Sequence, residues 1–158
     1  MEVILFEPEI PPNTGNIARL CAALGLRLHL IEPLGFKLDD RHLRRAGLDY
    51  WPAVDLAVWP AWPAFKDSWG GGRLWGTSAR AGRVYVEADF AAGDGLVFGP
   101  ETRGLPVAVK SELHGLLRVP IRPVVRSINL ATCVGLVVGE ALRQTGGWAA
   151  GEGGPGEG

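Results

Sequence analysis

The sequence predicts an α/β fold in which a mostly parallel sheet carries helices on both faces. Short apolar runs of strand length alternate along the chain with segments whose apolar residues recur at helical spacing. Glycine, proline or polar residues bound each run, and the predicted strands are residues 3–6, 28–31, 74–77, 96–98 and 117–119. Such alternation is typical of a parallel sheet between two layers of helices.

The length and composition predict one domain. A chain of 158 residues can bury a real core, since a domain of this size hides roughly two-thirds of its unfolded surface. We expect this domain to span residues 1–145. Residues 146–158 are mostly Gly, Ala, Glu and Pro, which bury too little surface to order themselves, so they predict a flexible tail. The formal net charge of −1 carries no overall signature of polyanion binding, so any nucleic-acid site must be a local patch.

Composition also argues against several classes of protein. No apolar run approaches the roughly 20 residues of a bilayer-spanning helix, and the first residues lack the basic segment of a signal peptide. Cys21 and Cys133 are far apart, so they predict neither a disulfide framework nor a CxxC site, and a reducing cytosol fits. The three histidines do not pair with cysteines or carboxylates at metal-ligand spacing, so we expect no metal.

The first predicted helix has clear boundaries. Asn13 and Thr14 are expected N-caps, and Gly25 is expected to end the helix. Between them, apolar side chains recur at i, i+3, i+4 and i+7, namely Ile17, Leu20, Cys21 and Leu24. Arg19 lies off this stripe, one turn from Asn16, so both side chains could point at one ligand. A capped helix with a solvated arginine is the alternative interpretation.

The remaining helical patterns differ in character. Residues 49–72 mix four tryptophans with three prolines, which predicts one strand, a short helix and loops. The last helix, residues 129–144, is apolar nearly all round and must therefore be buried all round. Gly135 and Gly139 would let another helix approach closely. We therefore predict a homodimer formed through this helix.

Glycine, proline, asparagine and arginine gather in three segments near strand ends, where open α/β sheets bind ligands. The first, residues 7–19, is a rigid turn that delivers a helix N-terminus, whose free N–H groups attract anions. The third, residues 117–130, is extended and punctuated by prolines. Ser127 and Asn129 within it are also good N-caps, which is their plain structural interpretation.

The second segment, residues 96–106, is an apolar strand that breaks into a glycine loop. Gly99 and Gly104 permit close backbone approach or a positive φ. Glu101 beside Arg103 supplies an acceptor and a donor, or simply a surface ion pair. The loop lacks the Gly-Lys-Ser/Thr ending of a nucleoside-triphosphate loop.

A basic cluster lies within residues 35–51, formed by Lys37, Arg41, Arg44 and Arg45. Two aspartates offset part of the charge, so a solvated face is one interpretation. With Tyr50 and Trp51 nearby for stacking, the cluster would equally suit phosphate contacts to RNA.

Taken in order, three stretches resemble the three motifs of the SPOUT methyltransferases. They are Pro-Pro-Asn-Thr-Gly-Asn-Ile-Ala-Arg (11–19), Phe-Gly-Pro-Glu-Thr-Arg-Gly-Leu-Pro (98–106) and Arg-Ser-Ile-Asn-Leu (126–130). The ending Leu-Arg-Arg-Ala-Gly-Leu-Asp-Tyr (43–50) narrows the resemblance to the subgroup that 2′-O-methylates the wobble cytidine or uridine of leucine tRNAs. The resemblance covers about residues 1–144.

The resemblance implies a C-terminal trefoil knot, a homodimer and a cytoplasmic enzyme acting on tRNA. It also implies that S-adenosylmethionine lies in the knot, held largely by backbone groups of three loops, and leaves as S-adenosylhomocysteine. Carried over by motif, the cofactor contacts would be Thr77, Gly99, Val119 and Ser127.

Methyl transfer is an in-line displacement, so the protein must align the ribose oxygen and help to remove its proton. Arg19 resembles the motif-one arginine that the family places at the 2′-hydroxyl. Because a guanidinium holds its proton tightly, we favour orientation and charge stabilisation for it. Asn129 is the expected positioning hydrogen-bond partner, and Glu101 is the second candidate for accepting the proton.

Two departures from the family pattern affect the RNA contacts. Gly139 stands where relatives often carry a tyrosine, and Val124 and Val125 stand where they often carry polar residues. Three alternatives stay open: a related enzyme for another tRNA or rRNA site, a non-catalytic RNA-binding dimer, and a nucleotide hydrolase. For the hydrolase, neither a Ser-His-Asp set nor a phosphate-loop lysine can be assembled.

Overall fold

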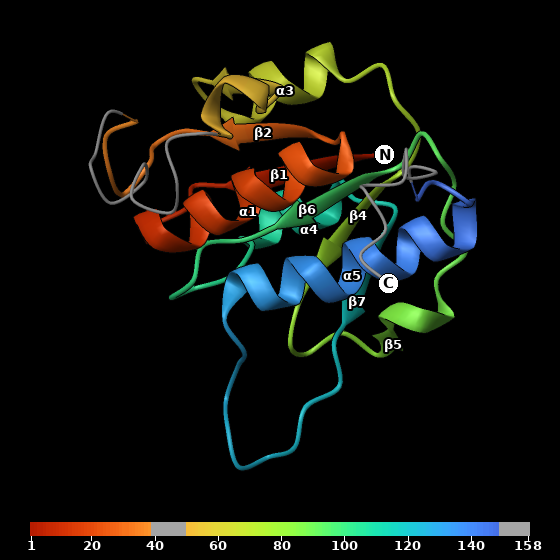
Figure 1. Cartoon of the computed structure of the whole chain (residues 1–158). Coiled ribbons are helices and arrows are strands. Elements are labelled where there is room, and N and C mark those ends of the chain that lie inside the picture. Colours follow the sequence, from red (N-terminus) through yellow and green to blue (C-terminus); the bar gives the residue numbers. More distant parts are fainter. Residues whose placement is uncertain (39–49, 149–158) are drawn as a thin grey trace, which may run out of the picture.

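A computed structural model describes residues 1–38 and 50–148 of the chain. Within these ranges, seven strands form one sheet in the order β3-β2-β1-β6-β4-β7-β5, and every pairing is parallel (Figure 1). The strands are β1 (Glu2–Phe6), β2 (Arg27–Ile31), β3 (Leu56–Trp59), β4 (Leu74–Thr77), β5 (Arg83–Val84), β6 (Gly95–Phe98) and β7 (Gly115–Arg118).

Helices cover both faces of the sheet, as the sequence predicts. The helices are α1 (Pro11–Leu24), α3 (Trp62–Ser68), α4 (Val107–Ser111) and α5 (Leu130–Thr145), with 3-10 turns η1 (Trp51–Ala53) and η2 (Tyr85–Glu87). Helices α1 and α5 pack against each other on one face (Figure 1), while α3 and α4 supply side chains to the core on the other. None of these helices is long and apolar enough to cross a bilayer.

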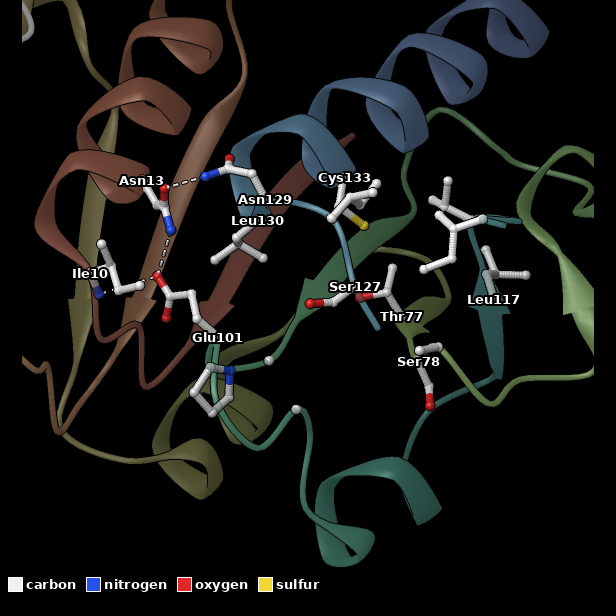
Figure 2. A pocket seen from close by; sticks show the side chains of 17 residues that line it. Ile10, Asn13, Thr77, Ser78, Glu101, Leu117, Ser127, Asn129, Leu130 and Cys133 are labelled. Carbon is white, nitrogen blue, oxygen red and sulfur yellow. Dashed lines mark hydrogen bonds between the residues drawn. The ribbon is translucent and has the colours of Figure 1, made fainter. Parts of the chain in front are cut away.

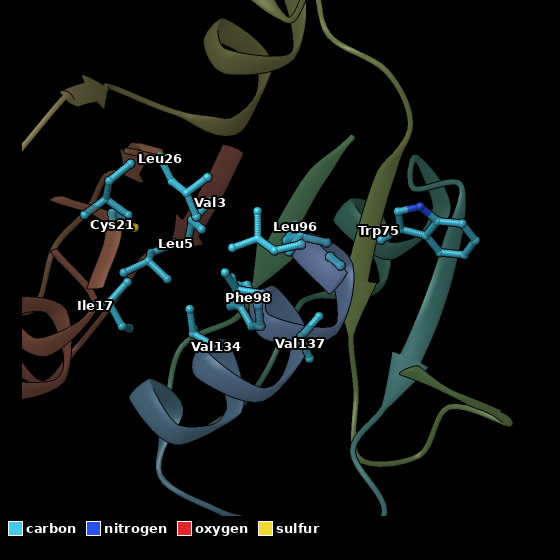
Figure 3. Packing of buried hydrophobic residues seen from close by; sticks show 14 of the residues in the cluster. Val3, Leu5, Ile17, Cys21, Leu26, Trp75, Leu96, Phe98, Val134 and Val137 are labelled. Carbon is cyan, nitrogen blue, oxygen red and sulfur yellow. The ribbon is translucent and has the colours of Figure 1, made fainter. Parts of the chain in front are cut away.

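The core lies on both sides of the sheet because successive strand residues point to opposite faces. Val3 and Leu5 join the cluster under α1 and α5, which Figure 3 shows with Phe98 and Val134 at its centre. Ile4, between them, joins the cluster under α3 and α4. A strand buried on both faces has no polar face, which is why these strands read as continuous apolar runs.

Helix α1 confirms one predicted boundary and corrects the other. Gly25 ends it in the left-handed conformation, with φ of 64°. The expected N-caps, Asn13 and Thr14, are wrong: the cap position is Ile10, without a side-chain cap, and both residues are buried inside the helix. The helix starts earlier because prolines occupy its first two positions, where their fixed φ favours a helix and a missing N–H is harmless.

Helix α5 begins where it was predicted to begin. Asn129 is its N-cap, and the side-chain oxygen accepts from the N–H groups of Ala131 and Thr132. Ser127 lies outside the helix, so it is no cap. The described residues bury one side of α5, namely Val134, Val137, Val138, Ala141 and Leu142. Leu136 on the outer side is 41% exposed.

The other elements follow the prediction unevenly. Residues 50–72 do contain one strand and a short helix, β3 and α3, together with the turn η1. Strand β7 begins and ends earlier than the predicted residues 117–119. The short elements β5, η2 and α4 were not anticipated.

Candidate active site

A cavity of about 360 Å³ opens at the carboxyl ends of β4, β6 and β7, beside the start of α5 (Figure 2). Its volume is that of a small-molecule site. The neighbouring order β6-β4-β7 places the loops that follow these three strands side by side. The position is the one that open parallel sheets use for ligands.

All four residues predicted to contact the cofactor line this cavity. They come from four separate segments: Thr77 ends β4, Gly99 follows β6, Val119 follows β7, and Ser127 precedes α5. Asn129 lines the same cavity. Their contact with a cofactor stays a prediction, but the fold brings together residues that lie up to 52 positions apart in the sequence (129 minus 77).

The two positions in the loop after β6 require glycine for different physical reasons. A Cβ on Gly99 would lie 2.4 Å from the backbone nitrogen of Leu105 and 2.5 Å from the carbonyl carbon of Gly104, so the loop closes on itself there. Gly104 has a φ of +66°, which L side chains rarely adopt. The predicted close approach and positive φ are therefore both confirmed.

Glu101 and Arg103 do not form the surface ion pair that was the alternative interpretation of this loop, because Arg103 contacts Glu7 and Glu9. The Glu101 carboxylate accepts from the N–H of Glu9 at 2.9 Å, the N–H of Ile10 at 3.1 Å and the side-chain amide of Asn13 at 3.2 Å. The N–H groups at a helix start have no partners within the helix, and the positive end of the helix dipole favours a carboxylate. Glu101 thus completes the start of α1.

Arg103 instead contacts the carboxylates of Glu7 and Glu9, and thereby joins the loop after β6 to the loop after β1. The Glu9 carboxylate also accepts from the backbone N–H of Thr102 at 3.0 Å and from its hydroxyl at 2.9 Å. Glu7 adopts a φ of 47°, unusual for a residue other than glycine. Sequence reasoning missed this contact, which no local spacing reveals.

Asn13 was also missed as a site residue. The residue is 7% exposed, and its side chain accepts a hydrogen bond of 2.8 Å from the side-chain amide of Asn129 and donates to Glu101 (Figure 2). Motif one therefore meets motifs two and three through a single buried amide. The available signal was that Asn13 lies four residues before Ile17 and so extends the apolar stripe of the helix with a polar side chain.

Arg19 lies outside the cavity. It is exposed on α1, with its guanidinium carbon 6.0 Å from the ring centroid of Tyr50. The Tyr50 hydroxyl donates to the carbonyl of Gly15 at 2.9 Å. Burial raises the pKa of Tyr50 and the positive charge of Arg19 lowers it, with a net rise. The predicted pairing of Arg19 with Asn129 at one substrate stays a prediction.

The basic cluster is only partly placed. Lys37 is exposed, whereas Arg41, Arg44 and Arg45 lie outside the described residues. In residues 1–38 and 50–148, no group of three or more His, Cys, Asp or Glu side chains could hold a metal ion. Cys133 lines the cavity, and burial raises the pKa of its thiol to about 11.

Comparison with known proteins defines the class. A family model described as the SpoU rRNA Methylase family matches residues 1–139. The chain therefore belongs to this family and is an RNA methyltransferase of the SPOUT fold. Membership implies the C-terminal trefoil knot that the motifs predict.

Individual relatives narrow the comparison. The chain is 50% identical, over 146 residues, to a tRNA (cytidine(34)-2'-O)-methyltransferase of Saccharophagus degradans, an alignment that covers 91% of this chain and 95% of the relative. A solved structure from work on the 2-OH methylation of C/U34 on tRNA superposes with a TM-score of 0.86 at 49% identity, covering 90% of this chain and 94% of that one.

A solved structure that is more distant in sequence has the same fold. An AdoMet-bound rRNA methyltransferase from Sinorhizobium meliloti superposes with a TM-score of 0.82 at 26% identity. The match covers 90% of this chain and 55% of that chain, so the present protein corresponds to about half of the larger enzyme.

Proposed function

We propose that the protein transfers a methyl group from S-adenosylmethionine to the ribose 2′-hydroxyl of nucleotide 34, the wobble position, of tRNA. The observation that carries this is the cavity at the ends of β4, β6 and β7, where all four motif-derived residues and Asn129 meet. The relative from Saccharophagus degradans, which is 50% identical in sequence, supports position 34 of tRNA as the site of methylation. The choice of leucine tRNAs and a cytoplasmic location rest on the motif resemblance.

The residues present fit S-adenosylmethionine. The cavity combines backbone groups at Gly99 and Val119 with the side chains of Thr77 and Ser127, a set suited to a ligand read largely by hydrogen bonds. When bound, the cofactor supplies a methyl group on a positively charged sulfur, and S-adenosylhomocysteine is the product. The AdoMet-bound relative from Sinorhizobium meliloti supports this choice.

The chain's own residues divide the remaining work. Asn129 lines the cavity, where it can donate to an oxygen of the substrate. Arg19 lies outside the cavity, so within this proposal it contacts the RNA at the reacting ribose rather than the cofactor. Glu101 already accepts three hydrogen bonds, which leaves it poorly suited to take the ribose proton. Lys37 and its neighbours would contact phosphates.

We also propose a homodimer through α5. Its outer side carries the 41% exposed Leu136, and a Cβ added at Gly135 would meet nothing within 4 Å. A second copy would cover this side. Leu136→Glu should yield monomers in analytical ultracentrifugation, because it would bury a charge at the interface. A folded, active wild-type monomer would contradict the dimer.

The decisive experiment follows the methyl group. The protein is incubated with labelled S-adenosylmethionine and leucine tRNAs, and the methylated nucleotide is mapped by mass spectrometry. We expect one 2′-O-methyl group, at nucleotide 34. The matched substrate is an anticodon stem-loop with 2′-deoxyribose at position 34, which keeps the base and removes the acceptor; it should receive no methyl group.

The same experiment separates the alternatives. A methyl group at another position would identify a related enzyme for a different site. Methylation of the deoxy substrate would exclude ribose chemistry. RNA binding without affinity for S-adenosylhomocysteine would indicate the non-catalytic dimer. Arg19→Ala should lose activity, and the exposed Asp67→Asn on α3, on the opposite face of the sheet, should keep it.

A further inference from the structure

Three polar side chains form a continuous hydrogen-bonded chain along the cavity wall (Figure 2). The side-chain NH₂ group of Asn129 donates to the side-chain oxygen Oδ1 of Asn13 at 2.8 Å, and the side-chain NH₂ group of Asn13 donates to the Glu101 carboxylate at 3.2 Å. These hydrogen bonds join three separate segments of the polypeptide. Asn129 and Asn13 are 116 positions apart in the sequence, and Asn13 and Glu101 are 88 positions apart. All three residues line the cavity.

The direction of this chain is fixed from both ends. A carboxylate can only accept, so Asn13 must turn its NH₂ group towards Glu101 and its oxygen towards Asn129. At the other end, the Asn129 oxygen accepts from the N–H groups of Ala131 and Thr132, at 2.9 and 3.3 Å. Asn129 must therefore turn its NH₂ group towards Asn13.

Both requirements select the same orientation of the two amides. Turning the Asn129 amide over would place its NH₂ group against the N–H groups of α5 and its oxygen against the Asn13 oxygen. Turning Asn13 over as well would place that oxygen against the Glu101 carboxylate. Each alternative leaves donors or acceptors of the three side chains unpaired, and at the buried Asn13 water cannot readily replace the lost partner.

We propose that Glu101 and Asn13 are positioning residues that lock the Asn129 amide so that the cavity receives an N–H donor and never a carbonyl oxygen. An NH₂ group carries two hydrogens, and Asn129 uses one on Asn13. The second is left for an acceptor oxygen of the ribose or phosphate beside the reacting hydroxyl. This inference rests on the proposed function and assigns the motif-two glutamate a role other than that of a base.

The test breaks the link between residues 13 and 101 and then remakes it with donor and acceptor exchanged. In Glu101→Gln, an amide replaces the carboxylate and can present a donor to the Asn13 NH₂ group. In Asn13→Asp, two carboxylates face each other. In the double variant, the new glutamine can donate to the new aspartate, which still accepts from Asn129, so the Asn129 amide is held as in the wild type with the same total charge.

We expect each single variant to lower kcat about tenfold to a hundredfold, less than the roughly hundredfold to thousandfold that removing an aligned donor costs at other active sites, because the donor is misdirected and not removed. The KM for the cofactor should change far less. The double variant should recover to within about threefold of the wild type, since the link is remade. Asp67→Asn, which removes an exposed carboxylate on the other face, serves as the matched charge control.

Two results would overturn the inference. One is full kcat in Glu101→Gln. The other is a double variant as impaired as the product of the two single effects, which would reduce Glu101 to a cap on α1. Calorimetric binding of S-adenosylhomocysteine and thermal unfolding confirm that each variant is folded.

A readout without activity keeps this inference separate from the proposed function. Hydrogen exchange of the Asn129 side-chain hydrogen that bonds to Asn13, followed by NMR, should be slower in the wild type and in the double variant than in either single variant. If the wild type methylates no tRNA, the proposed function fails, while this exchange pattern still decides the orientation of the amide. Equal exchange in all four proteins would refute the locked amide.

Discussion

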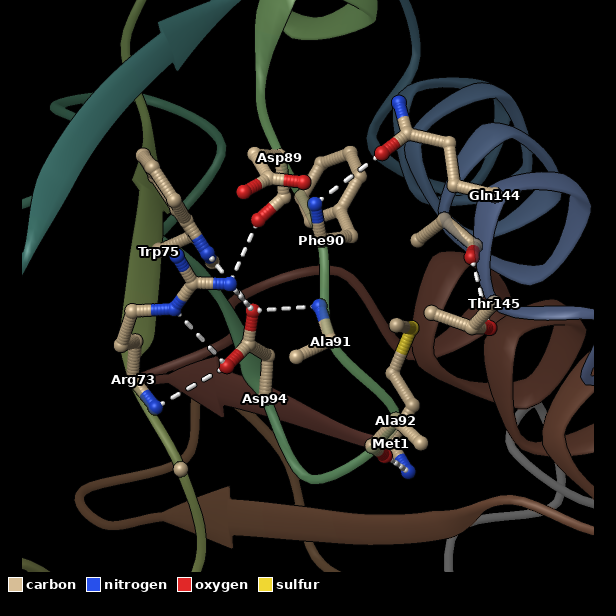
Figure 4. A network of polar contacts seen from close by, with 12 residues as sticks. Met1, Arg73, Trp75, Asp89, Phe90, Ala91, Ala92, Asp94, Gln144 and Thr145 are labelled. Atoms are coloured by element: carbon tan, nitrogen blue, oxygen red, sulfur yellow. Dashed lines mark hydrogen bonds and ion pairs between the residues drawn. The ribbon is translucent and has the colours of Figure 1, made fainter.

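Asp94→Asn should destabilise the fold by about 3 kcal/mol, close to the usual cost of breaking a buried ion pair. The Asp94 side chain is 1% exposed and lies at the start of β6 (Figure 4). One carboxylate oxygen accepts from the backbone N–H and the Nε of Arg73, at 3.0 and 3.2 Å. The other accepts from Arg73 Nη2, Trp75 Nε1 and the N–H of Ala91, between 2.8 and 3.0 Å.

An asparagine can keep only one of these acceptor oxygens. In its better orientation the NH₂ group faces the backbone N–H and Nε of Arg73, and two donors lose their partner. A buried donor left unpaired costs about 1–3 kcal/mol. The Arg73 side chain is 34% exposed, so water can reach its Nε and soften the loss. The expected loss of about 3 kcal/mol therefore comes mainly from the unpaired backbone N–H of Arg73 and from the lost charge of Asp94.

Urea unfolding at pH 7 measures this difference, with the exposed Asp89→Asn in the same loop as the control. The pH dependence gives a second check. Burial alone would raise the pKa of Asp94, but hydrogen bonds from Arg73, Ala91 and Trp75 hold it below its ordinary value.

A lowered pKa contributes stability that is present above the unfolded value, about 3.9, and is lost as the pH falls through the folded value. The difference in the free energy of unfolding between the wild type and Asp94→Asn should therefore be constant from about pH 5 to 8 and shrink below about pH 4. A gap under about 1 kcal/mol at pH 7, with unchanged urea dependence, would refute the reasoning.

Further substitutions test other parts of the structure. Thr14→Val should raise the free energy of unfolding by about 1 kcal/mol, because the buried Thr14 hydroxyl has no hydrogen-bond partner within the described residues; a loss of stability would contradict this. Gly99→Ala should weaken S-adenosylhomocysteine binding at least about tenfold in calorimetry, since its Cβ would meet backbone atoms. Burial raises the pKa of Cys21 to about 12 and that of Cys133 to about 11. Iodoacetamide should therefore label the two thiols of the native protein slowly at pH 8. Rapid labelling, followed by mass spectrometry, would contradict this burial.

The parts of the fold that sequence predicts are those in which burial leaves a pattern. Strand β1 is buried on both faces, so its residues form one apolar run. Strand β5 has two residues and begins at the exposed Arg83, so it has no such run. Helix α4 has five residues and starts at Val107, which is 81% exposed, so it is too short to show helical periodicity.

The site divides along similar lines. Motif glycines predict the cavity because a backbone requirement, such as the lack of space at Gly99, excludes every other residue. Charge pairing is harder to predict from the sequence, since Glu101 and Arg103 are only two positions apart and suggest a pair with each other. Strands β1 and β6 are adjacent and parallel, so their loops leave the sheet together, and each charge finds its partner on the other loop. Only the sheet order reveals this.

The two ends of β6 therefore serve different purposes. Asp94 precedes its first residue and ties β6 to β4, whereas Gly99 and Glu101 follow its last residue and shape the cavity. Asp94 and Gly99 are five residues apart, which corresponds to about 17 Å along the strand. Asp94→Asn should consequently lower stability while kcat stays near the wild-type value at temperatures where the variant is folded. Glu101→Gln should lower kcat strongly and stability less than Asp94→Asn does, because the hydrogen bonds that Glu101 accepts at the start of α1 are part-buried or exposed rather than in the core. Parallel losses of kcat and stability in both variants would mean that the two ends are not independent.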